Sequence, residues 1–197
     1  GGLRGYGVGG VGNPAGGRGV LALNVESVFP ISMSTTLAIV QERWAELVRD
    51  PALQDLPYKV ETNERGQILL SPHSNRHSFL QDKIQQVLRR HAPEGSTPPE
   101  FAVATPKGVK SPDVAWISPE RRQEMEATGD PTTLAPEICV DVLSESNTAE
   151  EMNEKRALYR EAGAREIWLV ELDGRIRFLS NDEQEQSQLA PDMPNHL

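Results

Sequence analysis

Two aspartates have the residue type and the setting for chemistry. Asp113 follows Pro112 at the start of a predicted strand, and Asp141 lies inside the strand predicted over residues 137–143. Alternate residues of a strand share a face, which places Asp141 opposite the apolar Ile138, Val140 and Val142. Burying a carboxylate is costly unless it is paired with a cation or binds a metal. Asp141 therefore marks either a functional site or, as the alternatives, a salt bridge or a strand with one solvated face.

Lys155 is the third residue of this kind. A capping box over residues 148–151 begins a helix that is predicted to extend to Gly163. Helical spacing places Lys155 between Met152 and Tyr159 on the apolar stripe of this helix. Because the stripe must pack on the sheet that carries Asp141, the ammonium group could reach the aspartates. The alternative is a lysine that extends past its neighbours into solvent.

The elements around these residues predict an α/β fold. Apolar spacing predicts helices over residues 35–49 and 75–91, the first capped by Ser34 and the second with Phe79 on its apolar face. Strand 137–143, helix 148–163 and strand 166–171 form a βαβ unit with parallel strands and a right-handed crossover. The remaining predicted strands complete a mixed sheet flanked by helices, and they cover residues 58–62, 67–71, 100–105, 113–117 and 174–180.

Length, charge and composition limit the possible functions. The 197 residues fit one domain, and a net charge of -9 argues against a generally basic nucleic-acid coat or a membrane-surface binder. The single cysteine, Cys139, excludes an internal disulfide, and no apolar run is long enough to cross a membrane. We therefore expect a cytoplasmic protein with no membrane association.

The glycines are concentrated at one end of the chain. Residues 1–32 contain most of them and read as a disordered segment that is either natural upstream sequence or was added to the protein, because Met33 resembles a natural start. Residues 7–12 match a dinucleotide-binding fingerprint, but no strand precedes them, so no nucleotide cofactor is expected. The folded domain is expected over residues 33–180, followed by a flexible acidic tail over 181–197.

Four stretches resemble, in order and spacing, the Uma family of putative restriction endonucleases, which belongs to the PD-(D/E)XK nuclease superfamily. Further upstream, Val60-Glu61, Ser71-Pro72 and His77 are similar to the hairpin and the helix start of that family. The four stretches are SPDVAW from Ser111, PEICVDVLS from Pro136, EKRALYREAG from Glu154 and EIWLV from Glu166. The resemblance implies a restriction-endonuclease-like mixed sheet that contains the βαβ unit.

The resemblance also implies roles for individual residues. Asp113 and Asp141 would be the metal-binding acids, the main-chain carbonyl of Val142 a further ligand, and Glu61 an outer acid. His77 matches a family position whose role is either catalytic or structural. Two departures stand out: Leu143 occupies the usual lysine position, so that Lys155 supplies the lysine, and Asp141 stands where family members more often have glutamate. The shorter side chain leaves Glu137 as an alternative carboxylate on the same face.

The carboxylate and carbonyl oxygens implied as ligands suit Mg²⁺ or Mn²⁺. His73 and His77 have i,i+4 spacing but lack the glutamate of a zinc-protease motif. The expected activity is therefore metal-dependent hydrolysis of DNA by a homodimer, since cutting two strands needs two sites. Candidate phosphate contacts are the basic residues Lys83, Arg89, Arg90, Lys107, Lys110, Arg121 and Arg122.

Two other classes of function remain open from the sequence. The chain could be an inactive nuclease-fold protein that binds nucleic acid or a protein partner. It could also be an ordinary α/β domain in which the buried acids and the lysine form a structural ion-pair cluster.

Overall fold

A computed structural model of the protein describes residues 32–54, 56–145 and 147–197. The helices in this part of the chain are α1 (Met33–Arg49), α2 (Asn75–His91), α3 (Pro119–Glu126) and α4 (Ala149–Glu161). The strands are β1 (Tyr58–Thr62), β2 (Ile68–Pro72), β3 (Val103–Thr105), β4 (Gly108–Lys110), β5 (Val114–Trp116), β6 (Ile138–Val142), β7 (Glu166–Val170), β8 (Ile176–Leu179) and β9 (Glu183–Gln184).

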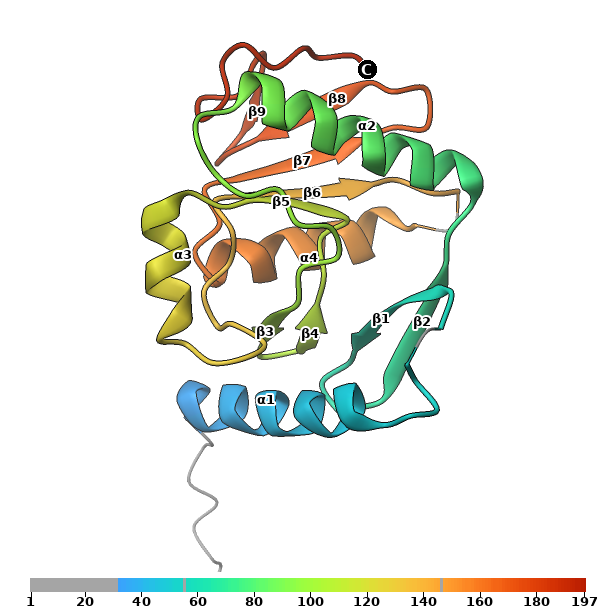
Figure 1. The fold of residues 1–197 in the computed structure, drawn as a ribbon, viewed down its shortest axis with the longest axis vertical. Coiled ribbons are helices and arrows are strands. Elements are labelled where there is room, and N and C mark those ends of the chain that lie inside the picture. Colours follow the sequence, from blue (N-terminus) through green and yellow to red (C-terminus); the bar gives the residue numbers. More distant parts are fainter. Residues whose placement is uncertain (1–31, 55, 146) are drawn as a thin grey trace, which may run out of the picture. The chain divides into compact units, whose positions relative to one another are not determined.

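The main sheet has the strand order β5-β6-β7-β8-β9 (Figure 1). Strands β6 and β7 are parallel, with Asp141 opposite Leu169, and α4 connects them. The neighbouring pairs β5 with β6, β7 with β8, and β8 with β9 are antiparallel. The predicted α/β fold with a mixed sheet and an embedded βαβ unit is confirmed.

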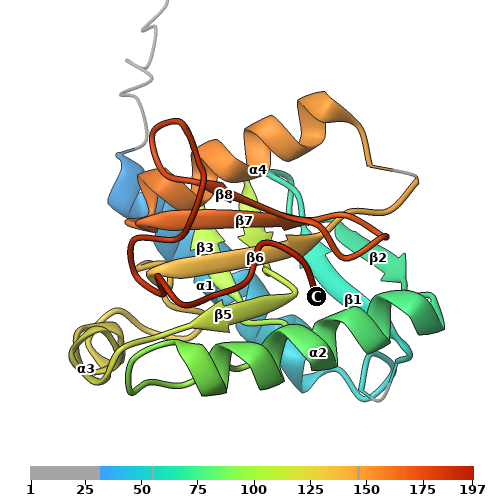
Figure 2. The same ribbon diagram turned by 90° about the horizontal axis from the view of Figure 1, so that it is seen from above.

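Helices α2 and α4 cover opposite faces of this sheet (Figure 2). On the α2 face, Ile84 and Leu88 of the helix pack in one core with Val140 and Trp168 of the sheet. On the α4 face, Met152 and Tyr159 pack in a second core with Cys139, Ile167 and Leu169. Because residues alternate along β6, Asp141 is on the α4 face, beside Cys139, as the strand pattern predicts.

Helix starts follow the local cap chemistry. Ser74 and Thr148 are the N-caps of α2 and α4, where their side chains accept hydrogen bonds from His77 N and Glu151 N. The bounds of α2 match the prediction, whereas α1 begins earlier than expected, with Ser32 in place of Ser34 as its cap.

Two short hairpins lie outside the main sheet. Strands β1 and β2 pair antiparallel around the turn at Gly66, as predicted. Strands β3 and β4 form a second hairpin, although the predicted strands over residues 100–105 and 113–117 left residues 106–110 without a strand. Gly108 turns this hairpin with φ of 90°, in the region that glycine adopts at little cost.

The prediction of a flexible tail over residues 181–197 is wrong for the structure described. Strand β9 pairs with β8, and Ala190 and Met193 are buried in the core on the α2 face. Ile176 N donates to Asn195 O over 2.8 Å. The acidic composition predicted a solvated segment. Two features nevertheless keep it on the sheet: a few buried apolar residues, and the free edge that β8 would present without β9.

Phe79 is a second difference from the sequence prediction. It was expected on the buried face of α2, yet 76% of it is exposed, while Ile84 and Leu88 are fully buried. Phe79 lies about 140° around the helix axis from Ile84, so it points away from the sheet, whereas Leu80, the next residue, packs against the core. Among the described residues, no helix has both the length and the apolar character needed to cross a membrane. The expectations for the glycine-rich stretch fall on residues 1–31, outside the described part of the chain.

Candidate active site

The two aspartates lie side by side because of the strand register. Val114 of β5 is opposite Val140 of β6, so the antiparallel pairing places Asp113, just before β5, next to Asp141. Val142 N donates to Asp113 Oδ2 over 2.7 Å, which fixes that carboxylate against the end of β6. Both aspartates are buried, at 2% and 3% exposure. Two carboxylates so deeply buried and so close need cations.

Lys155 supplies one of these cations from α4. Its ammonium group lies 2.9 Å from Asp141 Oδ1 and 3.0 Å from Glu61 Oε1. The ring of Tyr159, one turn further along the helix, lies 5.8 Å from the same nitrogen atom. Lys155 thus points into the protein from the apolar stripe of its helix, as its spacing predicts.

Lys59 supplies the second cation, and the sequence analysis missed it. Its ammonium group is 2.6 Å from Asp113 Oδ1, 3.8 Å from Asp141 Oδ1 and 4.0 Å from Glu61 Oε1. The period of two along β1 was a usable signal, since it puts Lys59 on the same face as Glu61. Strand β1 therefore contributes both an acid and a cation to the cluster.

The outer members of the cluster also come together. Glu61 Oε1 accepts a hydrogen bond from Ser111 N over 2.8 Å, which ties β1 to the segment before β5. His77 Nε2, in the first turn of α2, is 3.4 Å from Asp113 Oδ1. The residues to which the sequence analysis gave metal-binding or catalytic roles therefore lie in one place: Glu61, His77, Asp113, Asp141, Val142 and Lys155.

These residues line an open cavity of about 770 Å³. It lies at the carboxyl ends of β6 and β7, the edge at which α/β sheets commonly bind ligands. Of the seven basic residues proposed as phosphate contacts, none is among the described residues that line the cavity. Lys107 instead pairs with Glu154, and Arg89 Nε donates to Thr97 Oγ1 over 2.9 Å. Arg76, which the sequence analysis did not single out, is exposed and lines the cavity.

The charges in the cluster shift the pKa values of its members. Burial raises the pKa of Asp113, but Lys59, His77 and Lys155 together outweigh burial and hold that pKa well below its usual value. Burial raises the pKa of Asp141 and outweighs the opposing effect of Lys155. Burial would lower the pKa of Lys155, yet Asp141 and Glu61 hold it well above its usual value. Lys155 is consequently a permanently charged hydrogen-bond donor at neutral pH.

The donor set fits a divalent cation. Asp141 Oδ2 is buried and has no hydrogen-bond partner among the described residues, although Asp141 Oδ1 is 2.9 Å from Lys155. An uncompensated carboxylate oxygen beside a second carboxylate is what a hard cation requires. Glu137, the alternative carboxylate, lies at the opposite end of β6, where its side chain accepts hydrogen bonds from Ser118 N and Ser118 Oγ. The geometry therefore places Asp141, and not Glu137, beside Asp113.

Comparison with known proteins places this chain in a family. The sequence profile of Uma2, described as "putative restriction endonuclease", matches residues 44–194. The chain belongs to the Uma2 family. The resemblance stated from the motifs is thus confirmed, and the Uma2 match extends past residue 180 into the packed C-terminal segment. No match was found among curated proteins.

A solved structure shares the Uma2 fold seen here. It is a crystal structure of a putative nuclease belonging to DUF820 from Anabaena variabilis, at 15% sequence identity and a TM-score of 0.52. The match covers 70% of this chain and 86% of the other. The nuclease-like fold predicted from the sequence is confirmed at this level.

Proposed function

We propose that this Uma2 family member is a metal-dependent endonuclease that hydrolyses phosphodiester bonds in DNA. The observation that carries the proposal is the pair of adjacent buried carboxylates, Asp113 and Asp141, one of which has an oxygen with no partner among the described residues. The family match and the nuclease-like fold support the same reaction class.

Asp113, Asp141 and the carbonyl of Val142 would hold Mg²⁺ or Mn²⁺, since all three offer hard oxygen ligands. Such a cation, when bound, lowers the pKa of a bound water and offsets the charge that develops on the phosphate. The hydrogen bond from Val142 N keeps Asp113 Oδ2 in a fixed orientation, 2.7 Å from that nitrogen. The rigid ends of two paired strands therefore set the separation of the acids.

Lys155 would donate a hydrogen bond to the reacting phosphate or orient the attacking water. Because Asp141 and Glu61 hold its pKa well above its usual value, Lys155 keeps its proton and cannot serve as a general base. Glu61, 3.0 Å from the ammonium group, is a positioning residue for Lys155. Lys59 offsets the charge of the acids from the opposite side, 2.6 Å from Asp113.

DNA binding would rest on local charge, because the chain as a whole is acidic at -9. Arg76 lines the cavity and is the basic residue best placed to contact a phosphate. Two copies of the chain would be needed to cut both strands of a duplex, and we propose a homodimer for that reason.

Cleavage of DNA by purified protein tests the proposal. Supercoiled plasmid and single-stranded DNA are incubated with Mg²⁺ or Mn²⁺ and with wild type, Asp113→Asn, Lys155→Met or a control. We expect Asp113→Asn to lower the cleavage rate about 10³-fold and Lys155→Met about 10²-fold. The matched controls, Asp192→Asn and Arg49→Met, change exposed residues outside the cavity and should leave the rate unchanged.

Cleavage that both variants retain at the wild-type rate would refute the assignment of the site. Metal binding without cleavage by any form of the protein would instead favour an inactive nuclease fold that binds nucleic acid or a protein. A fully folded wild type with neither metal binding nor cleavage would favour a structural ion-pair cluster.

A further inference from the structure

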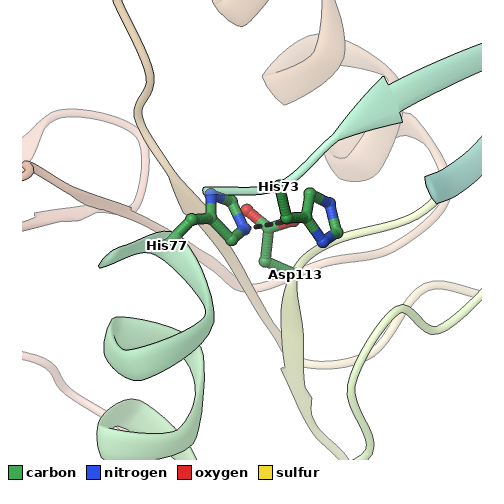
Figure 3. Close-up of side chains that lie close together, drawn as sticks. All are labelled: His73, His77 and Asp113. Carbon is green, nitrogen blue, oxygen red and sulfur yellow. Dashed lines mark ion pairs between the residues drawn. The ribbon is translucent and has the colours of Figure 1, made fainter. Parts of the chain in front are cut away.

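Two histidines lie close to Asp113, one member of the carboxylate pair. His73 follows β2, His77 is in the first turn of α2, and Asp113 precedes β5, so three separate segments bring these side chains together (Figure 3). The two imidazole rings are stacked, with centroids 4.5 Å apart and an interplanar angle of 9°. One potential ligand atom from each of the three residues lies within 4.8 Å of the others.

The Nε2 atoms of the two histidines make no hydrogen bond to the described residues, although His77 Nε2 lies 3.4 Å from Asp113 Oδ1. Both of these nitrogen atoms are buried. His77 as a whole is only 9% exposed. Buried polar atoms normally have partners, so two such nitrogens beside one carboxylate indicate a ligand.

The surroundings hold the two histidines and the aspartate in place. His73 Nδ1 lies 3.5 Å from Glu100 Oε1, and a carboxylate on the far nitrogen is the usual support of a metal-bound imidazole. Asp113 Oδ2 accepts from Val142 N over 2.7 Å, which leaves Asp113 Oδ1 facing His77 at 3.4 Å. Gln81 Nε2 donates to Asp113 O over 2.7 Å from the next turn of α2.

We propose that His73, His77 and Asp113 form a second cation position, selective for divalent transition metals such as Zn²⁺, Co²⁺ or Ni²⁺. Two imidazoles and one carboxylate suit these ions, whereas Mg²⁺ prefers oxygen ligands and retains its water. Ligand atoms around one such ion lie about 3–3.5 Å apart. Side-chain movements of about one ångström would therefore bring the three candidate ligand atoms to the distances that a bound ion requires. The position shares Asp113 with the proposed nuclease centre, but its existence does not require that the protein cleaves DNA.

Lys59 sets the affinity of this position. Its ammonium group lies 2.6 Å from Asp113 Oδ1, the same oxygen that faces His77, so a cation held by the histidines competes with it. Removing that competing charge should strengthen metal binding. Lys59→Met is therefore expected to tighten the binding of Co²⁺ about tenfold, which corresponds to about 1.4 kcal/mol.

Co²⁺ titration of tag-free protein tests the proposal without reference to cleavage. The visible absorption of bound Co²⁺ reports nitrogen ligation, and calorimetry with Co²⁺ and with Mg²⁺ gives the stoichiometry and affinity of each ion. We expect His73→Ala and His77→Ala each to weaken Co²⁺ binding at least about 100-fold, while Mg²⁺ binding at the acids changes little. Circular dichroism spectra confirm that each variant is folded.

Two matched variants separate this position from the proposed nuclease centre. Asp141→Asn removes a ligand of that centre only, so the visible spectrum of bound Co²⁺ should survive in it. His196→Ala removes an exposed imidazole near the C-terminus and should leave Co²⁺ binding unchanged.

Loss of Co²⁺ binding in His73→Ala with retention in Asp141→Asn would support the second position, whether or not the protein cleaves DNA. Co²⁺ binding that depends on Asp141 and not on His73 would overturn it and leave the nuclease proposal standing. Absence of Co²⁺ binding by folded wild type would also overturn it and would show the stacked histidines to be packing partners.

Discussion

Strands β6 and β7 carry buried carboxylates at both ends, and the two ends differ in how these charges are satisfied. At the amino end, Glu166 accepts hydrogen bonds from Trp168 Nε1, Ser187 Oγ, Gln188 N and Leu189 N, over 2.7 to 2.9 Å. Glu137 beside it accepts from Ser118 N over 3.2 Å and from Ser118 Oγ. At the carboxyl end, Asp141 lies beside a second acid, and its Oδ2 has no partner among the described residues.

The comparison distinguishes a structural acid from the pair of acids that we propose to be functional. Glu166 has its oxygens engaged by neutral donors that belong to the fold, and it ties the C-terminal segment to the sheet. The charges of Asp113 and Asp141 are instead offset by the ammonium groups of Lys59 and Lys155, and Asp141 Oδ2 has no hydrogen-bond partner among the described residues. Burial is similar at the two ends, at 4% exposure for Glu166 and 3% for Asp141, so the difference is in the partners and not in exposure.

The largest effect is expected at the carboxyl end. Asp141→Asn should lower the rate of DNA cleavage about 10³-fold, because it removes a charged cation ligand. The free energy of unfolding of this variant should differ from that of wild type by no more than about 1 kcal/mol, because burial already destabilises the charged form of Asp141. Cleavage assays and urea unfolding measure the two quantities. A severe loss of stability with normal cleavage would place Asp141 with the structural acids.

The opposite pattern is expected at the amino end. Glu166→Gln should lower the free energy of unfolding by about 2–3 kcal/mol, because the amide cannot accept all the hydrogen bonds that the carboxylate receives. Cleavage by the folded fraction should be unchanged, since Glu166 is far along β7 from the cavity. Urea unfolding and cleavage under fully folded conditions check both parts. Unchanged stability would show that the hydrogen bonds to Glu166 contribute little.

A smaller effect is expected from pH. The pKa of Asp113 in the folded protein lies well below its usual value, so its contribution to stability is present above about pH 4 and is lost as the pH falls towards the folded pKa. Between pH 6 and pH 3 the loss should be about 1 kcal/mol, and Asp113→Asn should show a correspondingly shallower decline. Urea unfolding across this range is the measurement, with Asp192→Asn as the control. Parallel declines in wild type and Asp113→Asn would contradict the expectation.

Local patterns predicted most of the elements that position the site. The capping box, the apolar spacing of α4 and the alternation along β6 placed Lys155 and Asp141 on faces that could meet, because each is a short-range rule of helix or strand geometry. The sequence left open whether the lysine extends into solvent instead. The motifs carried the family assignment, which the profile match over residues 44–194 confirms. The place of Lys59 in the site could in principle have been predicted, because it is two residues from Glu61 and so shares its face of the strand. A lysine in a short strand is, however, normally solvated.

The sequence by itself determined the fold class and the βαβ unit, and it placed Asp113 and Asp141 at strand positions, because these follow from periodicity, caps and residue type along contiguous stretches. Only the tertiary structure decided which charges meet. It brought Lys59 between the acids, stacked His73 on His77, separated Glu137 from the cavity and packed residues 181–197 on the sheet. The physical reason is that pairing of charges depends on the register and packing of segments far apart in the chain, and local spacing does not specify either.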